Sequence, residues 1–121
     1  MAKHTGPSNP LMQDLIKELK RKSFEQGVGI WKRVAEDLEK PARQRRIINL
    51  YKINKNTKDK DTVIVPGKVL SVGELSKKVD VAALMFSTEA RKKIEESKGK
   101  VMTIAELLKS NPEGKKVRIL G

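Results

Sequence analysis

The 121-residue chain contains no cysteine and a single histidine, His4. The lack of cysteine excludes disulfide scaffolds, thiolate zinc sites, iron–sulfur clusters and cysteine nucleophiles. One histidine cannot supply a two-histidine metal site, and it lies too near the N-terminus for a Ser-His-Asp triad. Glu36 and Glu39 could share a helix face, but the neighbouring Lys32 and Arg33 favour a solvated surface over a cation site. We therefore expect no enzyme, no metal and no cofactor.

Aromatic and apolar residues are also scarce. The four aromatic side chains are too few for an extended base-stacking platform. Apolar residues form 37% of the chain, below the usual 45–50% or so, so the core is expected to be thin. No apolar run approaches the roughly 18 residues that cross a bilayer. The N-terminus also lacks the apolar region of a secretory signal. We expect a cytoplasmic protein with a flexible basic tail at 1–8 and one domain at 9–121.

The charge balance is strongly positive. Lys and Arg number 27 against 15 Asp and Glu, giving a net charge of +12. Such an excess favours a polyanionic partner, with nucleic acid first and an anionic membrane surface second. The basic segment 40–60 holds eight cations against Asp59 alone. A charge run can be no more than solvated surface, but this one is dense and almost unopposed, so we predict phosphate contacts there.

The candidate phosphate-binding residues come mainly from this basic segment. Arginine presents a planar fork that suits bidentate phosphate contacts. A second group lies near the end of the first predicted helix, and one further lysine follows a predicted turn. The full set is Lys40, Arg43, Arg45, Arg46, Lys52, Lys55, Lys68, Lys20, Arg21 and Lys22.

The helical part, 9–41, is predicted to form an α-hairpin. Asn9 and Pro10 are typical of a helix start, and apolar residues at helical spacing predict a helix over 10–22. After two glycines, a second apolar face predicts a helix from 30 that ends before Pro41. Trp31 lies on that apolar face, so we expect it in the core rather than stacked on a base.

The rest of the chain is predicted to be mixed α/β. We expect a strand at 46–49 and a helical turn at 50–54. From 62 to 121 short strands and helices alternate, and three capping or turn signals punctuate them: Ser87 before a helix over 88–98 that Gly99 closes, a Thr103–Glu106 capping box, and a 111–114 turn. The strands are expected at 63–65, 68–70, 79–86, 101–102 and 117–120.

Pro66-Gly67 is predicted to be a structural type II turn between two strands, because proline fixes φ and glycine permits φ > 0. The following Lys68 gives the pair a superficial similarity to a phosphate-binding loop. That loop needs a glycine where Thr62 stands and a Ser or Thr where Val69 stands. A nucleotide site is therefore not expected.

Taken together, the motifs resemble those of one known family. They are Asn9-Pro10-Leu11, Trp31 with Val34-Ala35 and Leu38, Pro41, Arg43, Asn49-Leu50, Val65-Pro66-Gly67-Lys68-Val69-Leu70, Gly73, Val81-Ala82-Ala83, Phe86-Ser87, Asn111-Pro112-Glu113-Gly114 and Val117-Arg118-Ile119. In this order they resemble the archaeal and eukaryotic large-subunit ribosomal protein family L-eighteen-e, a relative of the bacterial L-fifteen family. The resemblance covers about 9–120, and the chain is compact, as archaeal members are.

The resemblance implies an α/β fold in which N-terminal helices precede an irregular superhelix of short β-β-α units. It also implies a structural role in the large ribosomal subunit, with ribosomal RNA and neighbouring ribosomal proteins as partners. Two other functions stay open on the residues alone, namely a DNA-binding module built on the hairpin and an adaptor for anionic surfaces. The carboxylates Glu36, Asp37 and Glu39 argue against a recognition helix in a DNA groove.

Overall fold

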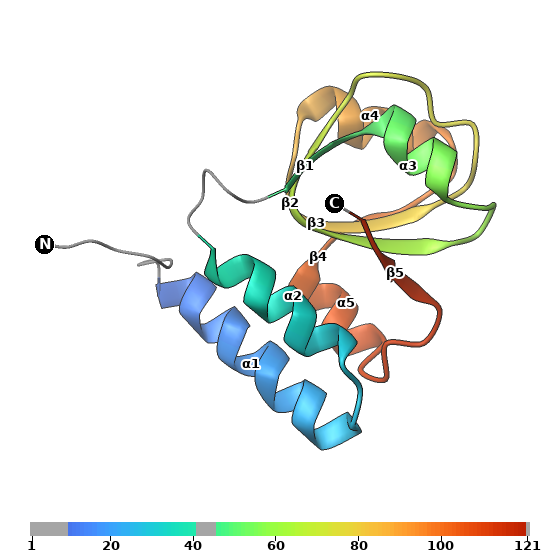
Figure 1. Ribbon diagram of the computed structural model, residues 1–121. Helices are drawn as coiled ribbons and strands as arrows, with labels where there is room; N and C mark the ends of the chain where they lie inside the picture. The colour runs from blue at the N-terminus through green and yellow to red at the C-terminus, as the bar shows by residue number, and fades with distance from the viewer. Residues whose placement is uncertain (1–9, 41–45, 121) are drawn as a thin grey trace, which may run out of the picture.

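The computed structural model describes residues 10–40 and 46–120. It shows one parallel β-sheet with helices on both faces (Figure 1). The predicted α/β class is therefore confirmed. The elements, in chain order, are α1 (Pro10–Gln26), α2 (Ile30–Glu39), β1 (Arg46–Asn49), α3 (Leu50–Asn56), β2 (Thr62–Leu70), β3 (Asp80–Phe86), α4 (Thr88–Glu96), β4 (Val101–Thr103), α5 (Ile104–Ser110) and β5 (Val117–Ile119).

The sheet has the order β1-β2-β3-β4, and β5 also pairs with β2. Thr62 of β2 lies opposite Asp80 of β3 and opposite Val117 of β5, so β3 and β5 flank the start of β2 on its two edges. Further along, Arg46 of β1 pairs with Gly67. Every strand pair is parallel, and the N-terminal ends of β2, β3, β4 and β5 therefore meet at one edge of the sheet. β2, β3 and α4 follow one another as a β-β-α unit.

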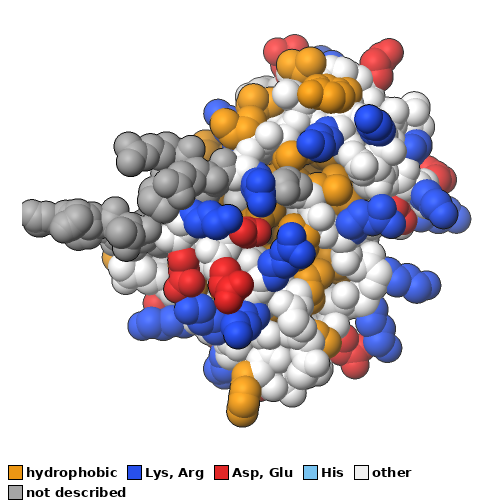
Figure 2. Space-filling view, in the orientation of Figure 1, with side chains coloured by type: hydrophobic (Ala, Val, Ile, Leu, Met, Phe, Trp, Pro, Cys, Tyr) orange, Lys and Arg blue, Asp and Glu red, His pale blue; other side chains and the backbone are white. Residues whose placement is uncertain are grey.

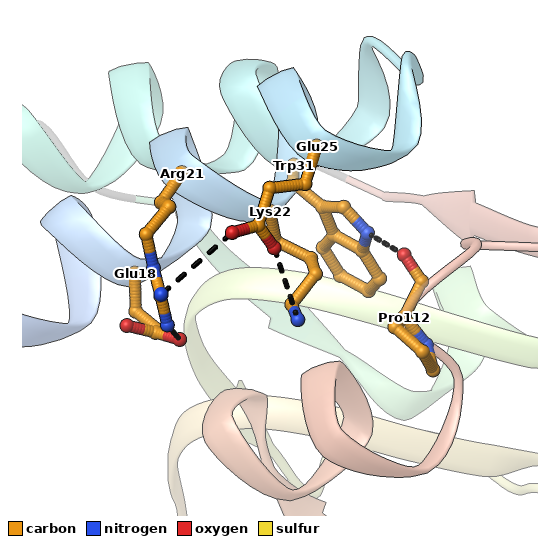
Figure 3. Close-up of polar contacts among 6 residues, drawn as sticks. All are labelled: Glu18, Arg21, Lys22, Glu25, Trp31 and Pro112. Carbon is orange, nitrogen blue, oxygen red and sulfur yellow. Dashed lines mark hydrogen bonds and ion pairs between the residues drawn. The ribbon is translucent and has the colours of Figure 1, made fainter.

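One face of the sheet is covered by α1, α2 and α5 (Figure 1). Trp31 is fully buried there, together with Leu19, Leu38 and Ile64. The Trp31 indole N–H donates to the Pro112 carbonyl at 2.7 Å, which ties the hairpin to the turn after α5 (Figure 3). The prediction that Trp31 is a core residue is confirmed.

The other face packs against α3 and α4 (Figure 1). Ile53 of α3 and Ile94 of α4 are fully buried against Val63, Val65 and Val81 of the sheet. A sheet buried on both faces explains why its strands read as nearly continuous apolar runs. The helices do not cover the end of β3, where Met85 is 59% exposed.

The predicted Ser87 cap, the Thr103–Glu106 capping box and the 111–114 turn are confirmed. The Ser87 hydroxyl accepts from the Ala90 N–H and caps α4, while the Thr103–Glu106 capping box opens α5. The 111–114 turn is closed by the Gly114 N–H, which donates to the Asn111 carbonyl at 2.9 Å.

The predicted turn at Pro66-Gly67 is wrong. β2 runs through both residues without a break, and Gly67 is not among the residues with positive φ. Val65 pairs with Ala83 and Lys68 with Met85, so the two residues lie opposite one residue of β3, as in a β-bulge. Proline has no N–H to donate to a neighbouring strand. A bulge interrupts the hydrogen bonds between the strands, so proline is tolerated there. A Cβ on Gly67 would lie 1.9 Å from the Arg46 carbonyl oxygen, so glycine is required by close approach rather than by φ.

Two helices differ from their predicted ends. α1 continues to Gln26, and Gly27 follows with φ +67°. α4 ends at Glu96, and Lys98 rather than Gly99 adopts the left-handed conformation, with φ +72°. The N–H groups of Lys98 and Gly99 then donate to the Glu95 and Ile94 carbonyls, which is the Schellman pattern. The predicted cap Asn9 and the predicted tail lie outside the described residues.

Candidate nucleic-acid interface

The positive charge is divided unevenly between the hairpin and the rest of the fold. Residues 10–40 hold seven Lys and Arg against six Asp and Glu, whereas residues 46–120 hold seventeen against nine. On the face that Figure 2 shows, cations and carboxylates lie next to one another over α1 and α2, whereas Lys and Arg predominate over the sheet. The hairpin is therefore almost neutral, and the sheet region carries most of the excess.

Four predicted phosphate-binding residues lie on the hairpin, and each has a carboxylate partner. Lys20 contacts Glu39 at 2.7 Å and links α1 to α2. Arg21 pairs with Glu18 and lies 3.7 Å from Glu25. The hydrogen bond that Arg21 donates to Glu18, together with the negative charge of Glu18 and Glu25, raises the pKa of Arg21 above its ordinary value.

Lys22 and Lys40 complete these hairpin cations. Lys22 lies 3.5 Å from Glu25, and Lys40 lies 3.2 Å from Asp37. Surface pairs of this kind are worth at most about 1 kcal/mol, so pairing alone does not prevent a phosphate contact. The low net charge around them, however, gives a polyanion little long-range attraction.

Four other predicted residues, the sheet-side cations, belong to β1, α3 and β2. Arg46, Lys52, Lys55 and Lys68 are all exposed. Within the described part of the chain none of their side chains forms an ion pair or hydrogen bond. Arg43 and Arg45 lie outside the described residues.

Four lysines outside the predicted set of ten come together at the N-terminal edge of the sheet, and one of them, Lys60, belongs to the basic segment 40–60. Lys116 precedes β5, Lys60 precedes β2, Lys78 precedes β3 and Lys100 precedes β4, each by one or two residues. Because the strands are parallel and lie in the order β5-β2-β3-β4, the four backbones form a row. Adjacent strands are about 4.8 Å apart, so this lysine row spans about 14 Å.

Backbone hydrogen bonds hold the lysine row in place. The Lys60 N–H donates to the Lys78 carbonyl at 2.6 Å, and the Val81 N–H donates to the Lys100 carbonyl at 2.9 Å. Lys60 and Lys116 have left-handed φ values of 72° and 59°, in tight turns just before their strands. All four side chains of the row are exposed and, in the described ranges, free of ion pairs.

Three aspartates share this edge and reduce its net charge. Asp61 accepts from the Lys58 N–H at 2.8 Å, Asp59 accepts from the Lys78 N–H at 2.7 Å, and Asp80 accepts from the Lys100 N–H at 3.1 Å. Their carboxylates shape the loops through backbone bonds rather than through contacts with the lysine side chains. The ammonium groups therefore stay available to a ligand.

Other cations of the sheet region stabilise the fold. Lys77 donates to the Asn54 and Thr57 carbonyls at 2.5 and 2.6 Å and so caps the C-terminal end of α3. Lys93 donates to the Ser71 and Gly73 carbonyls, both at 3.0 Å, and holds the β2–β3 connection against α4. These side chains are less available to a ligand than those of the row.

The described residues offer little for other kinds of chemistry. No group of three His, Asp or Glu side chains among them could hold a metal ion. No described helix is long and apolar enough to cross a membrane. The arrangement can present charge to an extended anion, and it brings no reactive groups together.

Comparison with known proteins gives a consistent result. The family model described as "Ribosomal protein 60S L18 and 50S L18e" matches residues 5–121. Three archaeal proteins named "Large ribosomal subunit protein eL18" are similar to nearly the whole chain. The protein of Sulfurisphaera tokodaii is 48% identical, covering 99% of this chain and 98% of the relative. That of Methanothermobacter thermautotrophicus is 42% identical and covers 99% of both chains.

The protein of Pyrobaculum aerophilum is 44% identical, covering 96% of this chain and 95% of the relative. The match extends over both the hairpin and the parallel sheet, so it concerns the whole fold rather than one motif. It confirms the resemblance drawn from the motifs. The chain therefore belongs to the large-subunit ribosomal protein family of 60S L18 and 50S L18e.

Proposed function

We propose that the chain binds ribosomal RNA through the lysine row and the sheet-side cations, and thereby supports assembly of the large subunit. The family consists of structural constituents of that subunit rather than of enzymes, and the proposal assigns the RNA contacts to particular residues. Neighbouring ribosomal proteins are the other expected partners. The binding is electrostatic, since lysines that neutralise phosphates release counterions from the RNA.

The observation that supports this most is the lysine row itself. Like charges placed side by side repel one another, and bound phosphates relieve that repulsion. The row spans about 14 Å, which corresponds to about four nucleotides of one strand at a rise of about 3.4 Å per nucleotide. An A-form helix hides its major groove, so contacts to phosphates and riboses are the readily available ones.

α3 adds to the same surface. It connects β1 to the parallel strand β2, and its C-terminal end therefore lies near the N-terminal edge of the sheet. Arg118 of β5 donates to the Asn56 carbonyl at 2.9 Å, which fixes that end of α3 beside β5. Lys55 lies in the last turn of α3 and is exposed. We infer that Lys55 and Lys52 continue the basic surface beyond the lysine row.

The hairpin is a weaker candidate for nucleic-acid binding. Its exposed carboxylates Glu36 and Glu39 would face the phosphates of a DNA duplex if α2 entered a groove. Four of its seven cations already have carboxylate partners, and its net charge is small. These features disfavour a DNA-binding module that uses α2 as its recognition helix.

Three triple variants test the proposal. The row variant carries Lys60→Gln, Lys78→Gln and Lys100→Gln. The segment variant carries Arg46→Gln, Lys52→Gln and Lys55→Gln, and the hairpin variant changes Lys20, Arg21 and Lys40 in the same way. Each loses three positive charges, so the hairpin variant is the matched control. Circular dichroism and thermal melting first establish that each variant is folded.

The measurement is affinity for a large-subunit ribosomal RNA fragment as a function of salt. Each lost phosphate contact flattens the slope of log affinity against log salt by about 0.7–0.9. The row variant and the segment variant should each lose about two units of slope, and the hairpin variant less than one. The losses should be similar for unrelated structured RNA, because phosphate contacts position without specifying sequence. Equal slopes for all folded variants and the parent would contradict the proposal.

A further inference from the structure

A second surface of the molecule differs from the rest in its chemistry. Between α1 and α5 lies a groove of about 500 Å³. Its apolar lining comes from Leu11 and Leu15 of α1 and from Ala105 and Leu108 of α5. Leu11 is 79% exposed. Most other apolar side chains of the hairpin pack against the sheet, with Phe24 as an exception, and Leu11 instead lies beside the groove.

The charged lining of the groove is net negative. Asp14, Glu18 and Glu106 contribute three carboxylates, and Lys22 and Lys109 contribute two cations. Lys22 extends from α1 toward α5, whereas the Glu18 carboxylate lies against the Arg21 guanidinium (Figure 3). In a chain of net charge +12, a negative surface of this kind is the exception. Asp14 forms no ion pair within the described part of the chain.

We propose that the α1–α5 groove binds a basic amphipathic segment of another protein of the large subunit. Leucine or isoleucine side chains of that segment would fill the space between Leu11, Leu15 and Leu108. Its lysines and arginines would face Asp14 and Glu18. Helix-in-groove recognition combines these two features, with apolar anchors in the groove and complementary charges at the rim.

The charge of the groove argues for this occupant over the others. RNA phosphates would be repelled by Asp14 and Glu106, whereas the charge of Glu18 is already balanced by Arg21. A second copy of this chain would have to present a basic apolar segment; among its described residues Ile47 and Tyr51 are exposed beside Arg46 and Lys52, so the cross-linking experiment includes a second copy among its outcomes. The lysine row and the groove would then bind different partners, one RNA and one protein.

The absence of cysteine from the chain makes a clean test possible. Ala105 is exposed and lines the groove, so Ala105→Cys can carry a benzophenone photo-cross-linker there. Phe24→Cys is the matched control, because Phe24 is 89% exposed on α1 but borders a different hollow, shared with α2. Both labelled proteins are incorporated into large subunits, which are irradiated. The cross-linked products are mapped by mass spectrometry.

We expect the label at position 105 to join a protein segment rich in Lys or Arg and carrying Leu or Ile, and the label at 24 not to join that segment. Asp14→Lys and Glu18→Lys, placed in the Ala105→Cys protein, should lower the yield severalfold, while Asp14→Glu should not. Joining to RNA, to an acidic segment or to a second copy would overturn the proposal, and so would the absence of a product. The dependence of RNA affinity on salt is measured on the same variants. This measurement distinguishes a failure of the proposed protein binding in the groove from a failure of the proposed RNA binding by the lysine row.

Discussion

Gly67 allows β1 to approach β2, and replacing it gives a sharp test of how the sheet is built. In Gly67→Ala, the new Cβ would lie 1.9 Å from the Arg46 carbonyl oxygen and 2.8 Å from its carbonyl carbon. Both atoms belong to the backbone, so no side chain can move aside. The two strands must separate by more than 1 Å, which is enough to break hydrogen bonds between them.

The cost can be estimated from what the separation disrupts. Two ladder hydrogen bonds contribute about 0.5–1.5 kcal/mol each. Ile48, which is 5% exposed and pairs with Val69, would also lose part of its packing. We expect Gly67→Ala to lower the free energy of unfolding by about 3 kcal/mol. At about 4 °C per kcal/mol for a domain of this size, the melting temperature should fall by about 12 °C.

The matched control is Gly29→Ala. Gly29 has φ −82°, and a Cβ built there has nothing within 4 Å, so its replacement should cost less than about 1 kcal/mol. Thermal melting by circular dichroism compares the two variants with the parent. Hydrogen exchange should also speed up at the β1 amides of Gly67→Ala. If Gly67→Ala melts within about 2 °C of Gly29→Ala, the close-approach argument is wrong.

Three further changes should show the value of single local contacts, each by thermal melting. Trp31→Phe keeps a six-membered aromatic ring but removes the pyrrole ring and its N–H, so the Pro112 carbonyl loses its donor and we expect a loss of about 2 kcal/mol; an unchanged melting temperature would show that the bond contributes nothing. Ser87→Ala removes the cap of α4 and should cost about 1 kcal/mol, whereas a neutral effect would mean that water replaces the hydroxyl. Lys98→Gly should stabilise by about 0.5 kcal/mol, because glycine adopts φ +72° without the strain of a lysine; a lower melting temperature would contradict this.

The elements with local signals were predicted well from the sequence. The hairpin follows from apolar spacing and two glycines, and the capping box at Thr103 depends on residues three apart. Such signals depend on residues within about one helical turn of each other. Tertiary contacts in this fold favour the same local structures that these signals predict. The β-branched run at 63–65 likewise predicted a strand, although the sequence did not indicate its length.

The error at Pro66-Gly67 has a different origin. A Pro-Gly pair is typical of a type II turn, and nothing nearby in the sequence argues against it. What decides its structure is the carbonyl of Arg46, twenty-one positions away in the chain. Glycine serves both a positive φ and a close backbone approach, and the sequence alone does not separate the two.

The lysine row could not be predicted from the sequence for a similar reason. Lys60, Lys78, Lys100 and Lys116 are well separated in sequence, and each is an ordinary lysine before a short strand. Only the parallel pairing of the strands brings them to one edge. The segment 40–60 was predicted to bind phosphates because its charges are close together in the sequence. The row is formed by the order and parallel pairing of the strands.

The most direct test of the proposed RNA surface is the reactivity of individual lysines toward acetylation, read by mass spectrometry. The free protein, intact large subunits and nuclease-treated subunits are compared under one set of conditions. Lys60, Lys78 and Lys100 should react in the free protein, be protected in the subunit and regain reactivity after nuclease digestion. Lys20 and Lys32 of the hairpin should react similarly in all three. Protection of the hairpin lysines together with full reactivity of the row in intact subunits would contradict the account.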